Sequence, residues 1–361
     1  MAQNELCSLL ERHGFSVKRG AGSLDTAFVA EYNSGKPGMT FAFLCEYDAL
    51  PELGHACGHN LISSAGFAAA LGLKEAFQEK GTVIVYGTPA EELEGSKHYI
   101  LEGGYMDEVD LMLASHYGSD WGSEVMGKAI VWPTHDNWVT FKGRASHASS
   151  SPEKGRSALD AVILTTMGLE FLREHMPETN RIHYIISKGG TAANSVPDLA
   201  TLNVELRTND SAELNSLMKR VDNVIKGAAL MTDTTPVYRW DAPWYCATPV
   251  PTLYRRAARY AADLGIDSSR FTFGNLPKAS SDLGCVAYKI PTVEITFPIV
   301  PDGEPAPVGH ADETACITGN EYPIDQSILA GKLMALTGLR IGGNKEELDL
   351  IQSEFASHFR E

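Results

Sequence analysis

The stretch that decides the fold reads Phe41-Ala-Phe-Leu-Cys-Glu-Tyr-Asp-Ala-Leu-Pro-Glu-Leu-Gly-His-Ala-Cys-Gly-His-Asn60. Its first residues belong to an apolar run, Met39–Cys45. A loop with acidic, histidine and thiol side chains follows this run. A continuous apolar run of this length is typical of a strand buried on both faces of a sheet. Thiol, imidazole and carboxylate groups are the side chains that hold transition metals. The stretch therefore predicts a buried strand followed by a loop of metal-binding type.

The first third of the chain continues with the same kind of alternation. A helix is predicted over Leu61–Gln78, a strand over Thr82–Tyr86, a short helix over Ser96–Glu102 and a strand over Leu111–Ser115. Strands and helices in strict alternation imply a parallel sheet. Since ligand sites in open α/β sheets lie past the carboxyl ends of the strands, we expect the functional loops at that edge.

Three candidate segments follow these strands. Cys57 and His59 lie in the loop after the first strand, Glu91-Glu92 follows the second, and His116 follows the third. Two adjacent carboxylates would repel each other in a closed site if both were ionised. A metal ion relieves that cost for one carboxylate and leaves the other to take a proton from metal-activated water. The alternative for Glu91-Glu92 is an exposed acidic turn.

The histidines have ordinary alternatives as well. A lone histidine at a strand end, such as His116, is more often a core or turn residue, and the same holds for His310 in its Gly/Pro-rich loop. His147 lies in a loop of small residues and can act at a metal only if its domain folds over the site. His55 stays ambiguous, inside the site loop. The histidines without a convergent partner are His13, His98, His135, His175, His183 and His358.

The middle third has a different pattern. The predicted elements are a strand over Val131–Phe141, a helix over Arg156–His175, strands over Arg181–Ser187 and Ala200–Thr208, a helix over Ser211–Met231 and a strand over Val237–Trp240. This β-α-β-β-α-β order is the ferredoxin-like arrangement. We therefore expect an α/β protein with a mostly parallel central sheet and an inserted ferredoxin-like domain.

The last third returns to α/β, and this sets the expected domain boundaries. A helix is predicted over Thr252–Leu264, strands over Phe271–Phe273 and Thr292–Phe297, and two helices close the chain. The first domain then comprises residues 1–128 and 243–361, and the insertion comprises residues 129–242. The 361 residues are comfortable for two domains.

Composition narrows the classes of function. The formal net charge of −16 argues against nucleic acid or an anionic membrane as a partner. No apolar run approaches the roughly 18 residues of a membrane helix, and no signal-peptide pattern opens the sequence. Six cysteines without a framework pattern suit a reducing compartment. We therefore expect a cytoplasmic protein. Serine-hydrolase and phosphate-loop motifs are missing from the sequence.

These motifs resemble the M20 family of metal-dependent peptidases and amidohydrolases. The resemblance is to the branch with Cys-Gly-His, which includes aminoacylases and dipeptidases, and is strongest to the β-alanyl-lysine type of dipeptidase. The motifs that carry it, in the family's order, are Glu46–Pro51, Gly54–Asn60, Gly87–Glu92, Phe141–Ala148, Asn194–Pro197, Arg207 and His310. They cover nearly the whole chain.

The resemblance implies a catalytic α/β domain with an inserted lid that forms a homodimer. It implies Glu91 as the general base and His147 as an oxyanion donor in the partner's site. Asn194 and Arg207 would bind the carboxylate end of the substrate. One or two divalent ions would be held by Cys57, His59, Glu92, His116 and His310. A thiolate ligand favours Zn²⁺, although a mixed site also accepts Mn²⁺, Co²⁺ or Ni²⁺.

Two departures from the family's pattern leave questions open. Glu46-Tyr47-Asp48 stands where the wider family has His-x-Asp, and Asn60 stands where relatives often have Asp. Which group would bridge two ions, and whether two bind, therefore stays open. The expected function is hydrolysis of the amide bond of a dipeptide or N-acyl amino acid with a free carboxylate. The alternative is an inactive metal-binding or regulatory homologue, against which the retained Glu91 argues, because a structural site needs no spare base.

Overall fold

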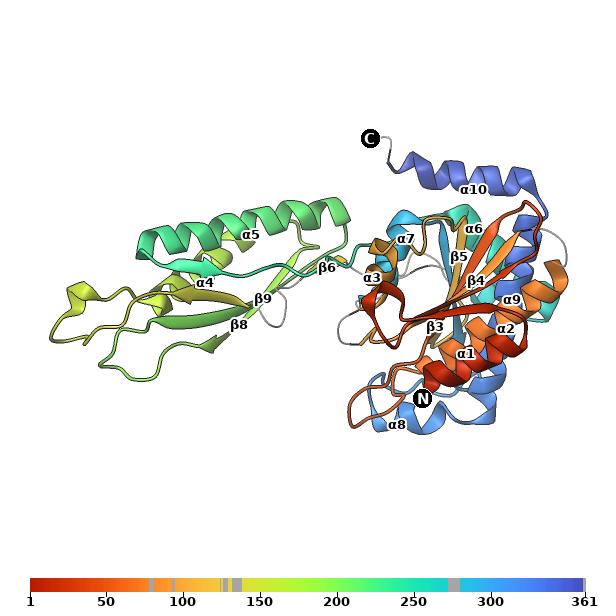
Figure 1. The fold of residues 1–361 in the computed structure, drawn as a ribbon, viewed down its shortest axis with the longest axis horizontal. Coiled ribbons are helices and arrows are strands. Elements are labelled where there is room, and N and C mark those ends of the chain that lie inside the picture. The colour runs from red at the N-terminus through yellow and green to blue at the C-terminus, as the bar shows by residue number, and fades with distance from the viewer. Residues whose placement is uncertain are drawn as a thin grey trace. The chain divides into compact units, whose positions relative to one another are not determined.

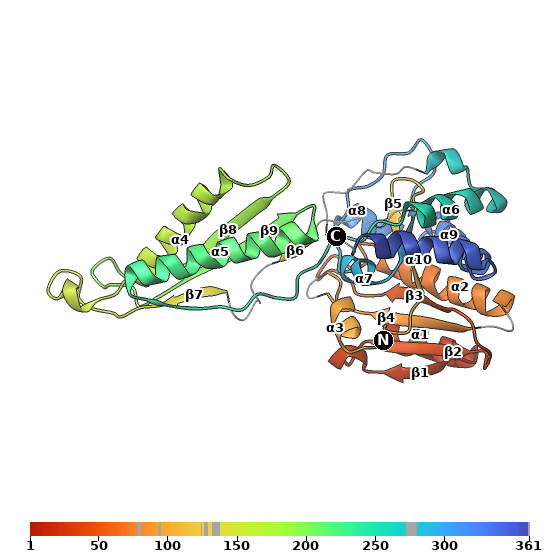
Figure 2. The same cartoon turned by 90° about the horizontal axis from the view of Figure 1, so that it is seen from above.

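A computed structural model describes residues 1–77, 81–92, 95–123, 125, 129–131, 138–271 and 280–359. The chain divides into two compact units (Figures 1 and 2). The first unit comprises Met1–Met126 and Ala247–Glu361, and the second comprises Gly127–Cys246. The second unit is therefore an insertion between two halves of the first.

The first unit is built on a six-stranded sheet in the order β1-β2-β4-β3-β5-β11. The strands are β1 (Ser16–Arg19), β2 (Phe28–Asn33), β3 (Thr40–Glu46), β4 (Thr82–Thr88), β5 (Leu111–Gly118) and β11 (Thr292–Pro298). Strand β3 is parallel to β4 and β5, and β5 is parallel to β11. The β1–β2 and β2–β4 pairs are antiparallel. The prediction of a mostly parallel α/β sheet is confirmed.

Helices cover both faces of this sheet, which explains why its central strands are apolar throughout. On β3, Phe41 and Phe43 belong to one buried cluster, whereas Ala42 and Leu44 belong to another. The first cluster includes side chains from α1 (Ala2–Arg12), α2 (His59–Phe77), α6 (Pro251–Ala261), α9 (Glu321–Gly342) and α10 (Lys345–Ser357). The second includes side chains from α3 (Lys97–Glu102) and α7 (Leu283–Lys289). A strand with a core on each face has no polar side to alternate with.

The second unit is an antiparallel sheet with two helices that pack against it and share one buried cluster. Its elements are β6 (Ala129–Val131), β7 (Val139–Lys142), α4 (Ala158–Arg173), β8 (Arg181–Lys188), β9 (Leu199–Thr208), α5 (Ser211–Thr232) and β10 (Thr235–Val237). Strand β9 pairs with β8 on one edge and with β7 on the other, and β7 pairs with β10. The predicted ferredoxin-like order is confirmed.

Three strand predictions need correction. The described part of Val131–Phe141 forms two strands, β6 and β7, which pair with different stretches of β9; residues 132–137, with His135, lie outside the described residues. The strand predicted over Val237–Trp240 lies earlier in the chain, as β10 (Thr235–Val237). Tyr238 and Trp240 lie outside this strand, and their side chains donate hydrogen bonds to Asp222 of α5.

The third correction concerns Phe271–Phe273. Phe271 is not in a strand, because its N–H closes a turn with the Ser268 carbonyl at 3.3 Å. Residues 272–273 lie outside the described part of the chain. The sequence analysis also missed β1 and β2, two short strands that add an antiparallel edge to the sheet.

Candidate active site

The predicted metal-binding segments of the first unit meet at one edge of its sheet. Cys57 lies in the loop after β3, His59 begins α2, and the Glu91-Glu92 pair follows β4. His310 lies in the loop between β11 and the short helix α8 (Asp312–Ile317). Since β3, β4, β5 and β11 run parallel in neighbouring positions, their carboxyl ends share this edge.

The position of His116 differs slightly from the prediction. Strand β5 runs on to Gly118, so that His116 lies within the strand and not beyond it. Its Nδ1 is 2.8 Å from the carbonyl oxygen of Tyr117, which leaves Nε2 to face Cys57 Sγ at 3.7 Å. The strand backbone therefore sets the direction of this imidazole.

The candidate ligand atoms gather in three overlapping groups, within each of which all atoms lie within 4.8 Å of one another. The groups are Cys57, His59 and His116; Cys57, Glu92 and His310; and His59, Glu91 and Glu92. All five predicted ligands and the predicted base therefore converge. Cys57, His59 and Glu92 each belong to two groups, so the three groups form one cluster.

Two buried atoms of this cluster support a fit to a metal ion. His59 Nε2 and Glu92 Oε1 are buried and have no hydrogen-bond partner among the described residues. Buried polar atoms in folded proteins nearly always have a partner, so unpaired ones need an explanation. A sulfur, nitrogen and oxygen donor set around such atoms matches the coordination chemistry of Zn²⁺ and related ions.

Asp48 is a site residue that the sequence analysis missed. Its Oδ1 lies 2.9 Å from His59 Nδ1, and its Oδ2 accepts the backbone N–H of Glu92 at 3.1 Å. Burial alone would raise the pKa of Asp48, but the hydrogen bonds from His59 and from the Glu92 backbone lower it. Such a carboxylate orients a ligating imidazole and fixes its tautomer. Its place in the Glu46–Pro51 motif was the available signal.

A buried charge network lies beneath the cluster. The Lys97 ammonium is fully buried, 2.7 Å from Glu46 Oε1 and in contact with the Asp282 carboxylate. Glu46 Oε2 is in turn 3.5 Å from His59 Nε2. Glu46 is therefore paired with a buried cation. Lys97 and Asp282 lie 185 residues apart, and nothing in the sequence pairs them.

Burial and like charges change the proton affinities here. Burial, with Asp282 and Glu46 nearby, raises the pKa of Glu91 to about 8. Burial would lower the pKa of His59, but Asp48 and Glu46 outweigh it and raise that pKa to about 9. Carboxylates with raised pKa values are suited to general acid–base work near neutral pH.

The backbone is strained at two positions beside the ligands. Ala90 and His310 adopt φ angles of 62° and 59°, which non-glycine residues rarely do. Such conformations cost roughly 1–3 kcal/mol each and gather at functional sites. Ala90 directly precedes Glu91, and His310 is anchored by its N–H to the Ala56 carbonyl at 3.1 Å. The strain sets the direction in which these two loops present their side chains.

The candidate residues of the second unit fall into two places. His147 and Asn194 lie on adjoining loops, because His147 bridges to Ser195 and the N–H of Ala148 donates to the Asn194 carbonyl at 2.9 Å. Arg207 lies near the other end of β9, opposite Ile130 of β6, and its Nε is 2.7 Å from Glu205. The structure therefore brings His147 and Asn194 together but not Arg207.

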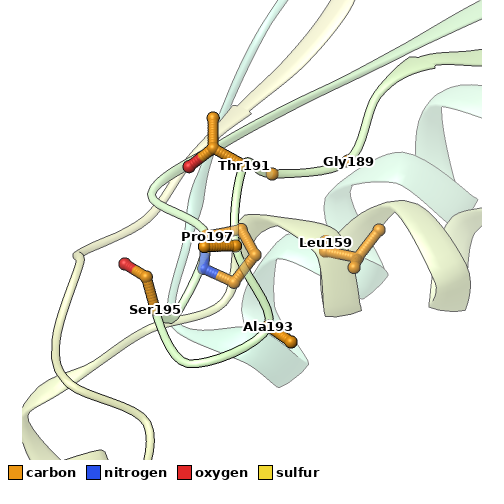
Figure 3. A pocket seen from close by; sticks show the side chains of 8 residues that line it. Leu159, Gly189, Thr191, Ala193, Ser195 and Pro197 are labelled. Carbon is orange, nitrogen blue, oxygen red and sulfur yellow. The ribbon is translucent and has the colours of Figure 1, made fainter.

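A pocket of about 390 Å³ lies beside the His147 and Asn194 loops. Figure 3 shows the 189–197 loop bending around Pro197, with Leu159 at the start of α4 on one side and Ser195 on the other. The lining residues are Leu159, Gly189, Gly190, Thr191, Ala192, Ala193, Ser195 and Pro197. None of the predicted metal ligands lines this pocket.

Comparisons with known proteins agree with this architecture. Residues 135–232 match the family model described as a peptidase dimerisation domain of the M20 type. The chain is 34% identical to a Xaa-Arg dipeptidase of Mus musculus over 94% of this chain and 79% of that protein. It is 38% identical to one of the two p-aminobenzoyl-glutamate hydrolase chains of Escherichia coli, over 71% of this chain and 56% of that one.

A solved structure from Bacillus subtilis has the same fold. It is described as a dinuclear metal-binding peptidase of the M20 family, with a TM-score of 0.63 and 17% identity over 95% of this chain and 92% of that one. The fold and the convergent hydrolase-type cluster define an amide-bond hydrolase with a two-part architecture. The chain belongs to the M20 family of peptidases and amidohydrolases and is an enzyme of that class. Among the described residues, no helix has the length and apolarity to cross a membrane.

Proposed function

We propose that this chain is a metal-dependent hydrolase that cleaves the amide bond of a dipeptide or an N-acyl amino acid with a free carboxylate. The observation that carries the proposal is the convergence of the five candidate ligands and Glu91, together with two buried ligand atoms that have no hydrogen-bond partner among the described residues. The five ligands are Cys57, His59, Glu92, His116 and His310. A second, unligated carboxylate is what a hydrolytic site needs and a purely structural metal site does not. The same observation argues against an inactive homologue.

Glu91 is the general base of the proposed mechanism. Cys57, His59, Glu92, His116 and His310 would hold one or two divalent ions, which when bound would polarise the scissile carbonyl and lower the pKa of water. Glu91, which lies in one group with His59 and Glu92, would accept the proton of the attacking water and pass it to the leaving amine nitrogen. Asp48 keeps His59 oriented, and the Lys97 ammonium balances the charge of Glu46 beneath the ligands.

One or two divalent ions suit this donor set, with Zn²⁺ first and Mn²⁺, Co²⁺ or Ni²⁺ as alternatives. The three candidate ligand groups share Cys57, His59 and Glu92, so the donors for more than one ion lie close together. Cys57 would be one of the ligands, and its thiolate would supply the soft donor that favours Zn²⁺. Residue 60 is Asn in this chain, and its side-chain N–H donates to the Thr318 carbonyl at 3.0 Å.

The second unit is proposed as a lid that forms a homodimer. The family match over residues 135–232 supports this role. Helix α4 also presents an exposed apolar stripe at helical spacing, with Ile163, Met167 and Phe171 exposed by 43%, 48% and 67%. We keep residues 1–128 and 243–361 as the catalytic domain and residues 129–242 as the lid.

The two ends of the lid would serve different active sites. The span of β9 from Leu199 to Arg207 is about 27 Å at 3.4 Å per residue, longer than a dipeptide. One substrate therefore cannot touch both Arg207 and the His147–Asn194 loops of the same lid. We propose that His147 is the oxyanion donor in the partner's site, and that the Asn194 and Arg207 that bind one substrate carboxylate come from two different chains.

Two relatives that cover most of the chain support a proposal for the substrate class. One is a Xaa-Arg dipeptidase and another belongs to a p-aminobenzoyl-glutamate hydrolase, and both names describe an amide next to a free carboxylate. The greater coverage of the first relative favours dipeptides with a basic C-terminal residue.

All six cysteines are thiols, which supports a reducing cytoplasm as the location of the protein.

Metal analysis combined with turnover of an amide panel tests the proposal. The panel contains Xaa-Arg and Xaa-Lys dipeptides, p-aminobenzoyl-glutamate and N-acetyl amino acids, each with its C-terminal amide as a control without the carboxylate. We expect one or two ions per chain and hydrolysis of the free acids only. A purified protein that binds metal but cleaves none of the panel would point to the inactive homologue.

A further inference from the structure

The loop that carries His147 forms a single tight turn. The His147 carbonyl accepts the N–H of Ser151 at 3.0 Å, so that residues 147–151 close one helix-like turn. On the other side, the His147 backbone bridges to Ser195 of the neighbouring loop. The imidazole is exposed, whereas its backbone is held on both sides. His147 therefore stands at the position of a helix N-cap, where a side chain usually accepts the free N–H groups of the first turn.

The His147 imidazole fills this capping role with one of its two nitrogens. The backbone N–H groups of Ser149 and Ser150 point to Nδ1, at 3.3 Å and 3.2 Å. A backbone N–H can only donate, so Nδ1 accepts both bonds through its lone pair. In the neutral ring the single proton then sits on Nε2.

The histidines of the metal cluster show the opposite arrangement. His59 Nδ1 faces the Asp48 carboxylate, and His116 Nδ1 faces the carbonyl oxygen of Tyr117. Both partners are acceptors, so in the neutral ring these two Nδ1 atoms carry the proton and each Nε2 lone pair is available to a metal. The group bound at Nδ1 thus separates His59 and His116 from His147.

We propose that the turn after His147 is a tautomer lock, in which the Ser149 and Ser150 amides are positioning groups that make Nε2–H an obligatory hydrogen-bond donor. The inference rests on the proposed function, in which His147 donates to the oxyanion that develops on the scissile carbonyl. A ring held in this form has no lone pair at Nε2. It can therefore be neither a metal ligand nor a general base through that atom, and only the donor role remains.

The lock can be tested directly by the ¹⁵N chemical shifts of the imidazole. The full-length protein is labelled with ¹⁵N-histidine, and the His147 signals are assigned by their loss in His147→Asn. Free neutral imidazole already leans toward the Nε2–H form, so the test compares two variants. Ser149→Ala keeps the backbone N–H, and Ser149→Pro removes it. We expect the same tautomer in wild type and Ser149→Ala and a mixed population in Ser149→Pro. A protonated Nδ1 in the wild type, or no change in a folded Ser149→Pro protein, overturns the proposal.

A second pair of variants keeps the proposal testable if Ser149→Pro does not fold. The Asn amide oxygen can reach the place of Nδ1 and keep the cap, whereas the Gln amide nitrogen can reach the place of Nε2 and keep the donor. Loss of an oxyanion donor costs roughly 10²–10³ in kcat. We expect His147→Asn to lose that much, with unchanged metal content, and His147→Gln to retain clearly more activity. An active Asn variant with an inactive Gln variant would show that the Nδ1 side is the functional one and would overturn the lock.

The two readouts separate this inference from the proposed function. A locked Nε2–H tautomer in a protein whose His147→Ala variant keeps full activity supports the lock and removes His147 from catalysis. An unlocked ring in a protein that depends on His147 overturns the lock and leaves the oxyanion role intact.

Discussion

The two regions that hold the candidate site residues differ in how they fix their side chains. In the first unit, His59 is buried, oriented by Asp48 and surrounded by donors from the ends of parallel strands. In the second unit, His147 and Asn194 are exposed and rest on loops that are tied together by their backbones. The buried cluster can be complete within one chain, whereas the exposed pair lies apart from every candidate metal ligand in the sequence. In the proposed function the first unit would hold the metal ligands, and the second would supply His147 and Asn194 to the partner's site.

The largest effect is expected from Glu91, the proposed proton acceptor in the cluster of the first unit. Glu91→Gln keeps the shape of the side chain but cannot accept a proton, so kcat should fall by roughly 10²–10⁴. Metal content should stay near wild type, because Glu91 would not be required as a ligand. Elemental analysis and steady-state kinetics of one preparation check both statements. Activity within a few-fold of wild type would remove Glu91 as the base.

The next largest effect is expected from His147 on the exposed loops of the second unit. Mixing two variants should also show which chain's site His147 serves. His147→Ala should lose roughly 10²–10³ in kcat and keep its metals. Mixing His147→Ala with Glu91→Gln chains should restore activity, because a mixed dimer holds one site with an intact base and an intact donor from the partner. Exchange of chains is verified by mass spectrometry of tagged proteins. If the chains exchange fully and activity does not recover, His147 acts in its own chain or has no catalytic role.

A smaller effect is expected from Asp48, which would orient the ligand His59 without binding metal itself. Asp48→Asn weakens the hold on His59 and should lower metal affinity by about 10- to 100-fold. The matched control is Asp25→Asn, an exposed aspartate of the same unit. Competition with a fluorescent chelator measures both variants. Equal affinities in the two variants would mean that Asp48 does not support the metal ligands.

The smallest effect should come from the backbone between two ligands. Gly58 and Gly54 both have positive φ, at 66° and 71°, so an added Cβ strains each by about 1 kcal/mol. A Cβ at Gly58 would also lie 2.8 Å from the Tyr117 ring, whereas at Gly54 nothing lies within 4 Å. Gly58→Ala should therefore lower the melting temperature and the metal affinity more than Gly54→Ala. Thermal unfolding with and without metal tests this, and indistinguishable variants would contradict it.

Much of the fold was predictable because its signals are local. The apolar runs at β3, β4 and β5 identify strands with a core on both faces, and their alternation with helices requires a parallel sheet. The predictions failed where a tertiary contact overrode the pattern. Tyr238 and Trp240 have a strand-like pattern but are held by Asp222 of α5, and the ladder forms earlier, at Thr235–Val237.

The chemistry of the site follows from the sequence alone, which gives the thiol, imidazole and carboxylate groups and the strand ends that bring Cys57, Glu92 and His116 to one edge of a sheet. It does so because parallel topology converts order along the chain into position in space. The contacts that hold these ligand side chains in place, in contrast, form only in the tertiary structure. Asp48 behind His59 and the Lys97–Asp282 pair are contacts between side chains of ordinary sequence context. Which nitrogen of each histidine is protonated depends on whether a donor or an acceptor faces it, and that is a property of packing between segments far apart in the chain.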